Sequence, residues 1–316
     1  MVIGLFCNRC TRASVFQLPD YKSPNYQIVL MSIRQITIIG TGLIGGSLAL
    51  ALRKKKFSGR SIGCDREAAL EKARERGAIE KGIADPADAI RGSDVVVLAT
   101  PVLAILDLID RLGPALSSKC LMTDVGSTKQ AVVERAQTVL GKNASKCFLG
   151  GHPMAGKEMS GIDYADPDLF QNAAWFFTPM EGQNLNQGTF AEFIGWIDQI
   201  GAKVAMMPAE QHDRLCAWIS HVPQMMSTAL AAALVDEFGE DAPLLPAGGR
   251  ALQEMTRISA SPYSMWRDVA ISNKKNLQDA LWKLEQKLAH IRENLATREL
   301  ANEFERAHAL RKKKNC

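Results

Sequence analysis

Residues 36–47 read Ile-Thr-Ile-Ile-Gly-Thr-Gly-Leu-Ile-Gly-Gly-Ser, an apolar run that ends in the spacing G-x-G-x-x-G at Gly40, Gly42 and Gly45. A helix-like stretch follows, and Asp65 closes a second apolar run 20 residues after Gly45. In this arrangement the first glycine makes a tight turn, the second lets the backbone approach a pyrophosphate, and the third lets the helix pack closely on the strand. The pattern therefore predicts a βαβ unit that binds a dinucleotide, with Asp65 accepting hydrogen bonds from the adenosine ribose.

The pyrophosphate of that dinucleotide is expected at the N-terminus of the helix, where backbone N–H groups have no partner within the helix. Arg66 either stacks on adenine or tolerates a 2′-phosphate, whereas Asp65 would repel that phosphate, so the sequence favours NAD over NADP as the cofactor. The residues that we assign to the cofactor site are Gly40, Gly42, Leu43, Ile44, Gly45, Asp65, Arg66, Thr100 and Pro101.

Strand-like and helix-like segments alternate from residue 36 to about residue 207. The expected strands are 35–40, 60–65, 94–99, 119–124, 147–150, 174–178 and 203–207, and the expected helices are 43–56, 67–77, 102–112, 127–139 and 187–200. Continuous apolar strands separated by helices are typical of a parallel sheet that is covered on both faces. We therefore expect an α/β doubly wound, Rossmann-type domain over residues 32–207, with an irregular or antiparallel end to its sheet.

Strand patterns stop after about residue 208, and helices are expected over 208–235, 250–258 and, as one long helix, 273–312. Leucine or isoleucine recurs along this last helix at alternating steps of four and three, at Leu277, Leu281, Leu284, Leu288, Ile291 and Leu295. Such a heptad seam packs either on helices of the same chain or on a second subunit. Because a domain this small has little else to cover so long a helix, we expect residues 208–316 to form an all-α domain that binds substrate and forms a homodimer.

Composition excludes several classes of partner. The chain has 316 residues, a net charge of +4 and 47% hydrophobic residues, which is ordinary for a globular protein and too weakly basic to indicate nucleic-acid binding. No apolar run is long enough to span a bilayer, so no membrane partner is expected. Residues 1–31 lack periodicity and are expected to be an N-terminal extension, with translation starting either at Met1 or at Met31.

The seven cysteines are odd in number and scattered, which argues against a disulfide framework and favours a reducing compartment, the cytoplasm. Cys7 and Cys10 have the C-x-x-C spacing of a metal or redox site, but no second pair accompanies them. We therefore expect no bound metal.

Three further motifs carry reactive side chains. Ser127 lies in D-V-G-S-T-K, residues 124–129, where it either caps the next helix or projects a hydroxyl into the cofactor cleft. His152 lies in G-G-H-P-M-A-G, residues 150–156, a composition that predicts a loop at the carboxyl end of a strand. The third group lies in the helical part and comprises S-H-V-P at residues 220–223 and T-R-I-S-A-S-P-Y-S-M-W-R-D at residues 256–268.

In this order, and together with G-x-G-L-I-G-G-S, these motifs resemble the prephenate and arogenate dehydrogenase family of tyrosine biosynthesis over residues 34–295. The resemblance implies an oxidoreductase that converts prephenate to 4-hydroxyphenylpyruvate with NAD. Hydride leaves ring carbon 4, the ring carboxylate departs as carbon dioxide, and the ring becomes aromatic. The alternative substrate is arogenate, which gives tyrosine.

The resemblance also implies roles for individual residues. His152 matches the family's catalytic histidine, and imidazole is suited to accept a proton near neutral pH. Ser127 matches a serine that hydrogen-bonds this histidine or the substrate hydroxyl. His221 is placed as a substrate contact, and Arg257 matches the arginine that grips the substrate side chain, since a guanidinium forks onto a carboxylate.

Two acidic residues are less firmly placed by the resemblance. Glu158 aligns with an acid near the substrate in many relatives, or is a solvated loop carboxylate. Asp163 would attract the ammonium of arogenate if it lies near the site, or is a surface turn residue. Prephenate is the expected substrate because it is the commoner one in the family.

Two other functions compete with this interpretation. A β-hydroxyacid dehydrogenase also joins a dinucleotide domain to a helical one, and Lys274 and Lys275 before Asn276 fit its catalytic lysine, but the G-x-H-P-M-A-G and S-H-x-P motifs argue against it. A non-catalytic NAD sensor would have no need to keep the full set of reactive side chains.

Overall fold

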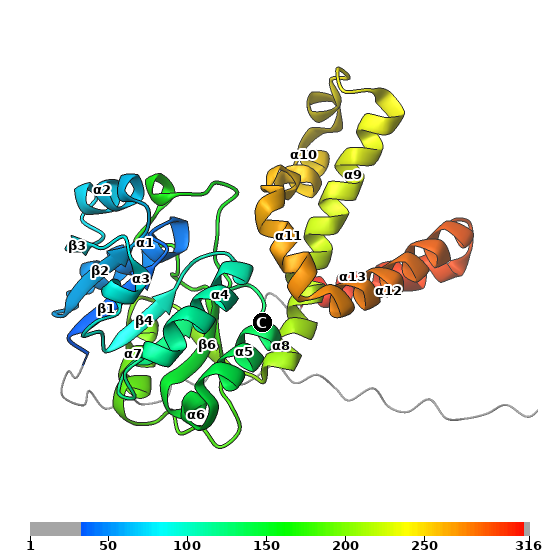
Figure 1. Cartoon of the computed structure of the whole chain (residues 1–316). Coiled ribbons are helices and arrows are strands. Elements are labelled where there is room, and N and C mark those ends of the chain that lie inside the picture. The colour runs from blue at the N-terminus through cyan, green and yellow to red at the C-terminus, as the bar shows by residue number, and fades with distance from the viewer. Residues whose placement is uncertain (1–32, 313–316) are drawn as a thin grey trace, which may run out of the picture.

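The computed structural model describes residues 33–312, so the predicted N-terminal extension lies outside the described residues. Figure 1 shows a part built around a sheet and a part built of helices that project away from it. The last strand of the first part, β8 (Lys203–Met206), is followed by the first helix of the second part, α8 (Ala209–Cys216). The predicted combination of an α/β doubly wound part and an all-α part is confirmed.

The sheet has the strand order β3-β2-β1-β4-β5-β6-β7-β8. Its strands are β1 (Gln35–Ile39), β2 (Arg60–Cys64), β3 (Lys81–Gly82), β4 (Val95–Leu98), β5 (Leu121–Asp124), β6 (Phe148–Pro153), β7 (Ala174–Thr178) and β8. Neighbours from β3 to β6 are parallel, β7 is antiparallel to β6, and β8 is parallel to β7. The strand order reverses between β1 and β4, and ligands of doubly wound sheets bind at the carboxyl ends of such a pair.

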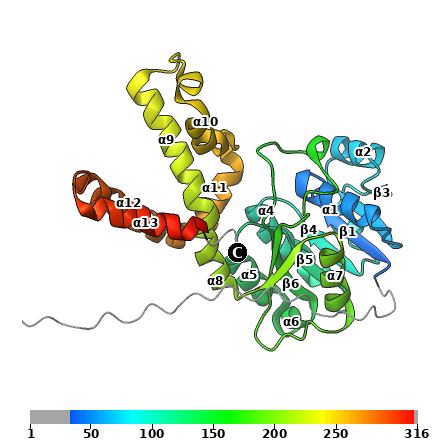
Figure 2. The same cartoon turned by 180° about the vertical axis from the view of Figure 1, so that it is seen from behind.

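Helices cover both faces of this sheet (Figures 1 and 2). They are α1 (Leu43–Lys54), α2 (Glu67–Glu75), α3 (Pro86–Ala89), α4 (Val102–Leu112), α5 (Gln130–Leu140), α6 (Ala144–Cys147) and α7 (Gly188–Gln199). Alternate residues of the central strands point to opposite faces: Ile38 and Val97 pack with α1 and α7, whereas Val96 and Leu98 pack with α4 and α5. Burial on both faces explains why these strands are mostly apolar.

The helical part forms two arms that leave α8 in different directions (Figures 1 and 2). A π-helical turn, Ala217–His221, joins α8 to α9 (Val222–Phe238). The first arm contains α9, α10 (Leu244–Thr256), a 3-10 turn (Arg257–Ala260) and α11 (Tyr263–Ser272), and the second contains α12 (Lys274–Glu293) and α13 (Arg298–Lys312). Helix α11 was not predicted. Gly249 interrupts α10 with a non-helical backbone, φ +60° and ψ −158°, so the helix predicted from residue 250 begins directly after this break and a short helical segment over residues 244–248 precedes it.

The single helix predicted over residues 273–312 is wrong, because the chain turns between α12 and α13. The side chain of Asn294 donates to the carbonyl of His290 at 2.9 Å, and the Thr297 hydroxyl accepts from the backbone N–H of Glu299 at 3.3 Å. Asparagine thus ends α12 and threonine starts α13, both in the roles these residues favour at helix ends. Of the predicted seam, Leu277 is buried, whereas Leu288 and Leu295 are 49% and 66% exposed.

None of the helices in residues 33–312 combines the length and the apolar character that a bilayer span requires.

Candidate active site

The glycine-rich loop lies between β1 and α1 at the switch point of the sheet. Gly40 has a φ of +97°, and a Cβ there would lie 2.4 Å from the carbonyl oxygen of Ala99. A Cβ on Gly45 would lie 2.0 Å from the carbonyl oxygen of Gly40, whereas one on Gly42 would meet no atom within 4 Å. Two glycines therefore allow the turn and the close helix packing, and the third keeps one side of the loop open.

The start of α1 and the ends of β2 and β4 surround this open side. Residues Leu43 and Ile44 are half-buried in the first turn of α1, and no side chain caps that turn. Asp65 directly follows β2, and Arg66 beside it is exposed. Uncapped N–H groups at a helix start suit a pyrophosphate, and a carboxylate at the end of β2 suits a ribose.

The end of β4 adds an unpaired hydroxyl to this region. Oγ1 of Thr100 is buried without a hydrogen-bond partner among the described residues, and the Thr100 methyl would lie 3.1 Å from a Cβ on Gly40. Pro101 is exposed between Thr100 and the first turn of α4. A buried unpaired hydroxyl is rare in proteins, so its presence beside the glycine-rich loop fits a site that takes a polar ligand.

His152 lies inside β6 rather than on a loop, which corrects the prediction from its glycines and proline. β6 pairs with β5 through residues 148–149 and continues along β7 through residues 150–153, where His152 lies opposite Phe176. A Cβ on Gly150 would lie 2.4 Å from Oγ1 of Thr178, and one on Gly151 would lie 2.7 Å from the carbonyl oxygen of Asp124. The two glycines therefore serve close packing around β6, not loop flexibility.

His152 is the first member of a buried chain of hydrogen bonds. Its Nδ1 lies 2.9 Å from Nε2 of His212, and Nδ1 of His212 lies 2.8 Å from Oδ1 of Asp213. Both partners belong to α8 in the helical part, and the side chains of all three residues are at least nine-tenths buried. Neither His212 nor Asp213 was predicted as a site residue.

The carboxylate of Asp213 also caps α5 in the other part of the molecule. It accepts from the backbone N–H groups of Lys129 at 2.6 Å and Gln130 at 2.9 Å. Helix α5 therefore starts at Gln130, and Ser127 is not its cap, which excludes one of the two roles predicted for that serine. Ser127 is half-buried in the segment between β5 and α5.

A buried ion pair holds the segment that carries Ser127. The Lys129 ammonium contacts Oδ2 of Asp124, and both side chains are fully buried. The same carboxylate accepts from the N–H groups of Gly126 at 2.8 Å and Gly151 at 3.2 Å. Asp124 therefore ties the backbone beside Ser127 to the residue that precedes His152.

Burial keeps the three histidines of this region neutral. It lowers the pKa of His152 and of His212 well below the ordinary value of 6.5, and the nearby Lys129 cation lowers both further. Burial also lowers the pKa of His221 to about 4, against an opposing effect of Asp213. At neutral pH each ring therefore has one nitrogen that donates and one that accepts.

His221 ends the π-helical turn before α9. Its Nδ1 lies 3.2 Å from Nδ2 of Asn273, and this amide also donates to the carbonyl of Asp213 at 2.8 Å. The amide orientation is fixed by that carbonyl, so Nδ1 of His221 accepts and its proton lies on Nε2. This Nε2 and the Nε1 of Trp266, whose ring lies edge-on to the imidazole, are buried donors without partners among the described residues.

Arg257 and Glu158 form an ion pair that joins the two parts of the molecule. Glu158 lies in the segment that follows β6, and Arg257 begins the 3-10 turn after α10. The Arg257 side chain is 64% exposed, so its guanidinium keeps access to a further ligand. Two predicted substrate contacts are thus brought together.

Two other candidates lie elsewhere. The Asp163 carboxylate pairs with Nζ of Lys72 on α2 at 2.7 Å, and both side chains are more than half exposed. This is the surface position that the sequence left open as the alternative to a substrate contact. Lys274 and Lys275 are exposed at the start of α12, so the lysine comparison with β-hydroxyacid dehydrogenases gains no support.

One cluster among residues 33–312 has donor atoms close enough to share a metal ion, namely His152, His212 and Cys216. Burial raises the pKa of the Cys216 thiol to about 12, which keeps it a neutral and poor ligand. The 2.9 Å between the two ring nitrogens is that of a hydrogen bond. We therefore assign this cluster to hydrogen bonding.

Comparisons with known proteins agree with this geometry. The family model described as "Prephenate dehydrogenase, nucleotide-binding domain" matches residues 48–206, and that described as "Prephenate dehydrogenase, dimerization domain" matches residues 208–309. The prephenate dehydrogenase of Bacillus subtilis is 35% identical over 256 residues, 77% of this chain, and that of Lactococcus lactis is 34% identical over 250 residues, 76% of this chain. The chain spans 65% of the length of each of these relatives.

Solved structures show the same similarity. The prephenate dehydrogenase from A. aeolicus in complex with hydroxyphenyl propionate and NAD+ superposes with a TM-score of 0.79 at 29% identity, covering 91% of this chain and 99% of that one. The arogenate dehydrogenase of Synechocystis superposes with a TM-score of 0.72 at 30% identity, covering 89% of this chain and 99% of that one. The chain therefore belongs to the prephenate dehydrogenase family.

Proposed function

We propose that this chain catalyses the oxidative decarboxylation of prephenate to 4-hydroxyphenylpyruvate in tyrosine biosynthesis, with NAD as the cofactor. The observation that carries the proposal is the buried, neutral imidazole of His152. Its Nδ1 is engaged by His212, which leaves Nε2 as the atom available to a substrate hydroxyl. A neutral imidazole is the form of histidine that accepts a proton.

Each side chain of the site has a part in this reaction. When bound, NAD+ supplies the acceptor for the hydride. His152 takes the proton of the 4-hydroxyl as that carbon acquires carbonyl character, and the phenolic oxygen regains a proton once carbon dioxide has left. Ser127 hydrogen-bonds the same hydroxyl or His152, and the Nε2–H of His221 donates to the substrate.

The substrate side chain is assigned to the helical part. Arg257 holds the side-chain carboxylate with its fork of N–H groups, and Glu158 pairs with the same guanidinium and borders the binding position. Residues 32–207 thus serve the cofactor and the base, and the residues from 208 onward serve the substrate side chain.

The preference for prephenate over arogenate rests on the surroundings of Asp163. Its carboxylate is paired with Lys72, so it has no unpaired charge to offer an ammonium group. The preference for NAD rests on Asp65, which would repel a 2′-phosphate. The A. aeolicus relative whose structure contains NAD+ supports the same cofactor.

A matrix of assays tests this function, with prephenate and arogenate each crossed against NAD and NADP and reduced nicotinamide followed by its near-ultraviolet absorbance. We expect the highest kcat/KM for prephenate with NAD. Equal or faster turnover of arogenate would overturn the assigned substrate. No turnover of either compound would overturn the function.

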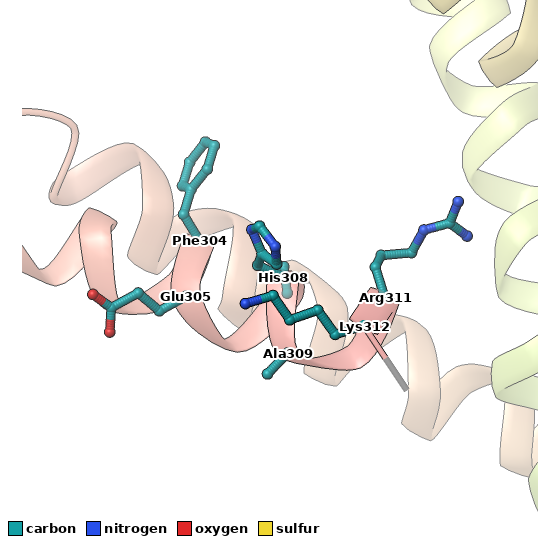
Figure 3. Close-up of a pocket in the computed structure, with 7 residues that line it drawn as sticks. Phe304, Glu305, His308, Ala309, Arg311 and Lys312 are labelled. Atoms are coloured by element: carbon teal, nitrogen blue, oxygen red, sulfur yellow. The ribbon is translucent and has the colours of Figure 1, made fainter. Parts of the chain in front are cut away.

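We also propose that the chain forms a homodimer through its helical part. The match to a dimerization domain over residues 208–309 supports this, as do exposed apolar side chains on both arms. On the second arm these are Trp282, Leu288, Leu295, Phe304 and Leu310. Figure 3 shows Phe304 on the same side of α13 as His308 and Arg311, and Phe304 is 70% exposed.

Sedimentation analysis of a Trp282→Glu, Leu288→Glu variant tests the dimer. We expect dissociation to monomers, because charges placed in an apolar interface must be desolvated on association. Tyr164→Glu, an exposed aromatic of the other part, is the matched control and leaves the dimer intact.

A cytoplasmic location is consistent with the four cysteines of residues 33–312, which are all free and buried.

A further inference from the structure

A chain of hydrogen bonds runs from Asp213 through His212 to His152. The proposed reaction uses His152 and does not by itself require the other two residues. Each link has the length of an ordinary hydrogen bond, 2.8 Å and 2.9 Å, and each member is buried. Its far end is the base of the proposed reaction, and its near end is a carboxylate that also caps α5. This chain of hydrogen bonds therefore begins at the Asp213 carboxylate, which only accepts hydrogen bonds when it is ionised, and ends at the reactive imidazole of His152.

The direction of every hydrogen bond follows from that fixed end. The Asp213 carboxylate accepts from two backbone N–H groups and carries no donor when ionised, so Nδ1 of His212 donates to it. His212 is neutral, so its Nε2 is left as an acceptor. Nδ1 of His152 must then donate to Nε2 of His212, which places the proton of neutral His152 on Nδ1 and the lone pair on Nε2.

This direction opposes the intrinsic preference of the ring. A neutral histidine side chain in water favours the form with the proton on Nε2, in which the atom nearest the substrate would be a donor. In that form His152 could not take a proton from a hydroxyl at Nε2. The hydrogen bonds from His152 to His212 and from His212 to Asp213 therefore make Nε2 of His152 a base.

We propose that His212 and Asp213 are positioning residues that hold the proton of His152 on Nδ1, so that its Nε2 lone pair faces the substrate hydroxyl. The kinetic part of this inference rests on the proposed function. In the proton transfer, the hydroxyl O–H bond breaks, an N–H bond forms at Nε2, and the resulting imidazolium keeps its Nδ1–H bond to His212. The positive charge of that imidazolium then lies one ring away from the Asp213 carboxylate.

His221 supplies an internal comparison, because its surroundings dictate the opposite form. Asn273 donates to Nδ1 of His221, so this ring carries its proton on Nε2. The structure thus assigns the Nδ1–H form to His152 and His212 and the Nε2–H form to His221. A loss of this pattern is measurable without any substrate.

The direct test is long-range nitrogen–proton NMR of the full chain with 15N-labelled histidine at neutral pH, in which the two neutral forms give different patterns. Resonances are assigned by single histidine-to-asparagine variants. We expect Nδ1–H for His152 and His212 and Nε2–H for His221. An Nε2–H pattern for His152 would overturn the proposal, whatever the outcome of the activity assays.

The kinetic test compares His212→Leu with His212→Gln. Leucine removes the acceptor for Nδ1–H of His152, so we expect kcat to fall at least about tenfold with KM for prephenate changed by less than about threefold. Glutamine returns an acceptor oxygen near the position of Nε2, so part of kcat is restored. Equal losses in both variants, or a loss confined to KM, would contradict the positioning role.

Cys216→Ala is the matched control, because its sulfur lies within hydrogen-bond reach of both rings, 3.4 Å from Nε2 of His212 and 3.9 Å from Nδ1 of His152, but the His152–His212 hydrogen bond does not pass through it. We expect this variant to keep both the Nδ1–H pattern and kcat while it loses buried volume at the same place. A fall in kcat equal to that of His212→Leu would show that packing alone matters. If His212→Leu does not fold, the NMR pattern of the unaltered chain still decides the proposal.

Discussion

The backbone N–H of Thr41 donates to Oδ2 of Asp65 at 2.8 Å, and the Thr41 hydroxyl donates to the same oxygen at 3.2 Å. The backbone N–H of Arg66 holds the other oxygen at 2.8 Å. These bonds connect the glycine-rich loop between β1 and α1 to the carboxyl end of β2. The Asp65 carboxylate, which faces the adenosine ribose in the proposed complex, is therefore held in place by the protein itself. Its negative charge is what would distinguish a 2′-hydroxyl from a 2′-phosphate on the cofactor.

Asp65→Asn removes that charge and keeps an oxygen that accepts from Thr41. We expect the ratio of kcat/KM for NADP to that for NAD to rise by at least about tenfold, because the repulsion of a 2′-phosphate is lost. Steady-state kinetics with both cofactors measure it. Asp88→Asn, the same change at an exposed residue of α3, serves as the control and leaves the ratio as it was. If this ratio of kcat/KM values were unchanged in both variants, Asp65 would not determine the cofactor preference.

Gly42 and Gly45 form a matched pair for separating binding from folding. Gly42→Ala adds a methyl where no protein atom lies within 4 Å, so stability is retained while KM for NAD rises as the methyl meets the pyrophosphate. Gly45→Ala places a methyl 2.0 Å from the Gly40 carbonyl oxygen, so we expect a loss of about 1–3 kcal/mol in the free energy of unfolding. Denaturant titration and NAD kinetics on both variants give the comparison, and identical behaviour of the two would refute it.

His152→Asn tests the base. We expect kcat to fall by about 10² to 10⁴, the usual contribution of general acid–base catalysis, with KM for prephenate nearly unchanged. Single-turnover measurements separate the chemical step from product release. A collapse of affinity with an intact kcat would mean that His152 binds the substrate and does not take its proton.

The sheet was predictable because its central strands are buried on both faces, so their sequences are mostly apolar and are separated by helical segments. β3 escaped prediction because it has two residues, too few to show a pattern. The long terminal helix was predicted wrongly because the heptad spacing runs past Asn294 to Leu295, although the side chains of Asn294 and Thr297 end one helix and start the next. Apolar spacing describes one face of a helix and does not show where that helix ends.

The reactive motifs could be found in the sequence, but the network that connects them could not. His152 and His212 are 60 positions apart, and Gln211-His212-Asp213 is a run of polar residues within a predicted helix. Nothing in that pattern shows that Asp213 caps a helix of the other part or that α8 packs on β6 and β7. The local setting of His152 was also misjudged, because glycines that permit close packing have the same composition as glycines that form a loop.

Acid pH is expected to destabilise the fold through its buried histidines. The pKa values of His152, His212 and His221 are lowered in the folded state, so below about pH 6.5 the unfolded chain binds protons that the folded chain does not. The contribution of these histidines to the free energy of unfolding is therefore complete above pH 6.5. It is lost as the pH falls toward 4, at about 1.4 kcal/mol per pH unit for each histidine. Burial raises the pKa of Asp213, which opposes this loss at the acid end of the window.

Urea titrations between pH 7 and pH 5 measure this slope. His221→Asn removes one of the three groups and is expected to reduce the slope by about a third. A free energy of unfolding that does not vary over this range would show that these histidines bind protons equally in both states.

Arg257 tests the assignment of the substrate carboxylate to the helical part. Arg257→Gln removes the charge and the paired N–H donors, so we expect KM for prephenate to rise by at least about tenfold, equivalent to about 1.4 kcal/mol, with a smaller change in kcat. Arg257→Lys keeps the positive charge without the forked pair of N–H donors, so its KM for prephenate should lie between that of the unaltered chain and that of Arg257→Gln. The free energy of unfolding should change by less than about 1 kcal/mol, because the Arg257 side chain is 64% exposed.

Glu158→Gln is the complementary variant, since it frees the guanidinium without removing it. If Arg257 binds the carboxylate of the substrate, this variant keeps a KM for prephenate close to that of the unaltered chain or lowers it, because the carboxylate of Glu158 no longer competes for the same N–H groups. A rise in KM equal to that of Arg257→Gln would instead mean that the ion pair itself shapes the site. An unchanged KM in Arg257→Gln would place the substrate carboxylate on another cation.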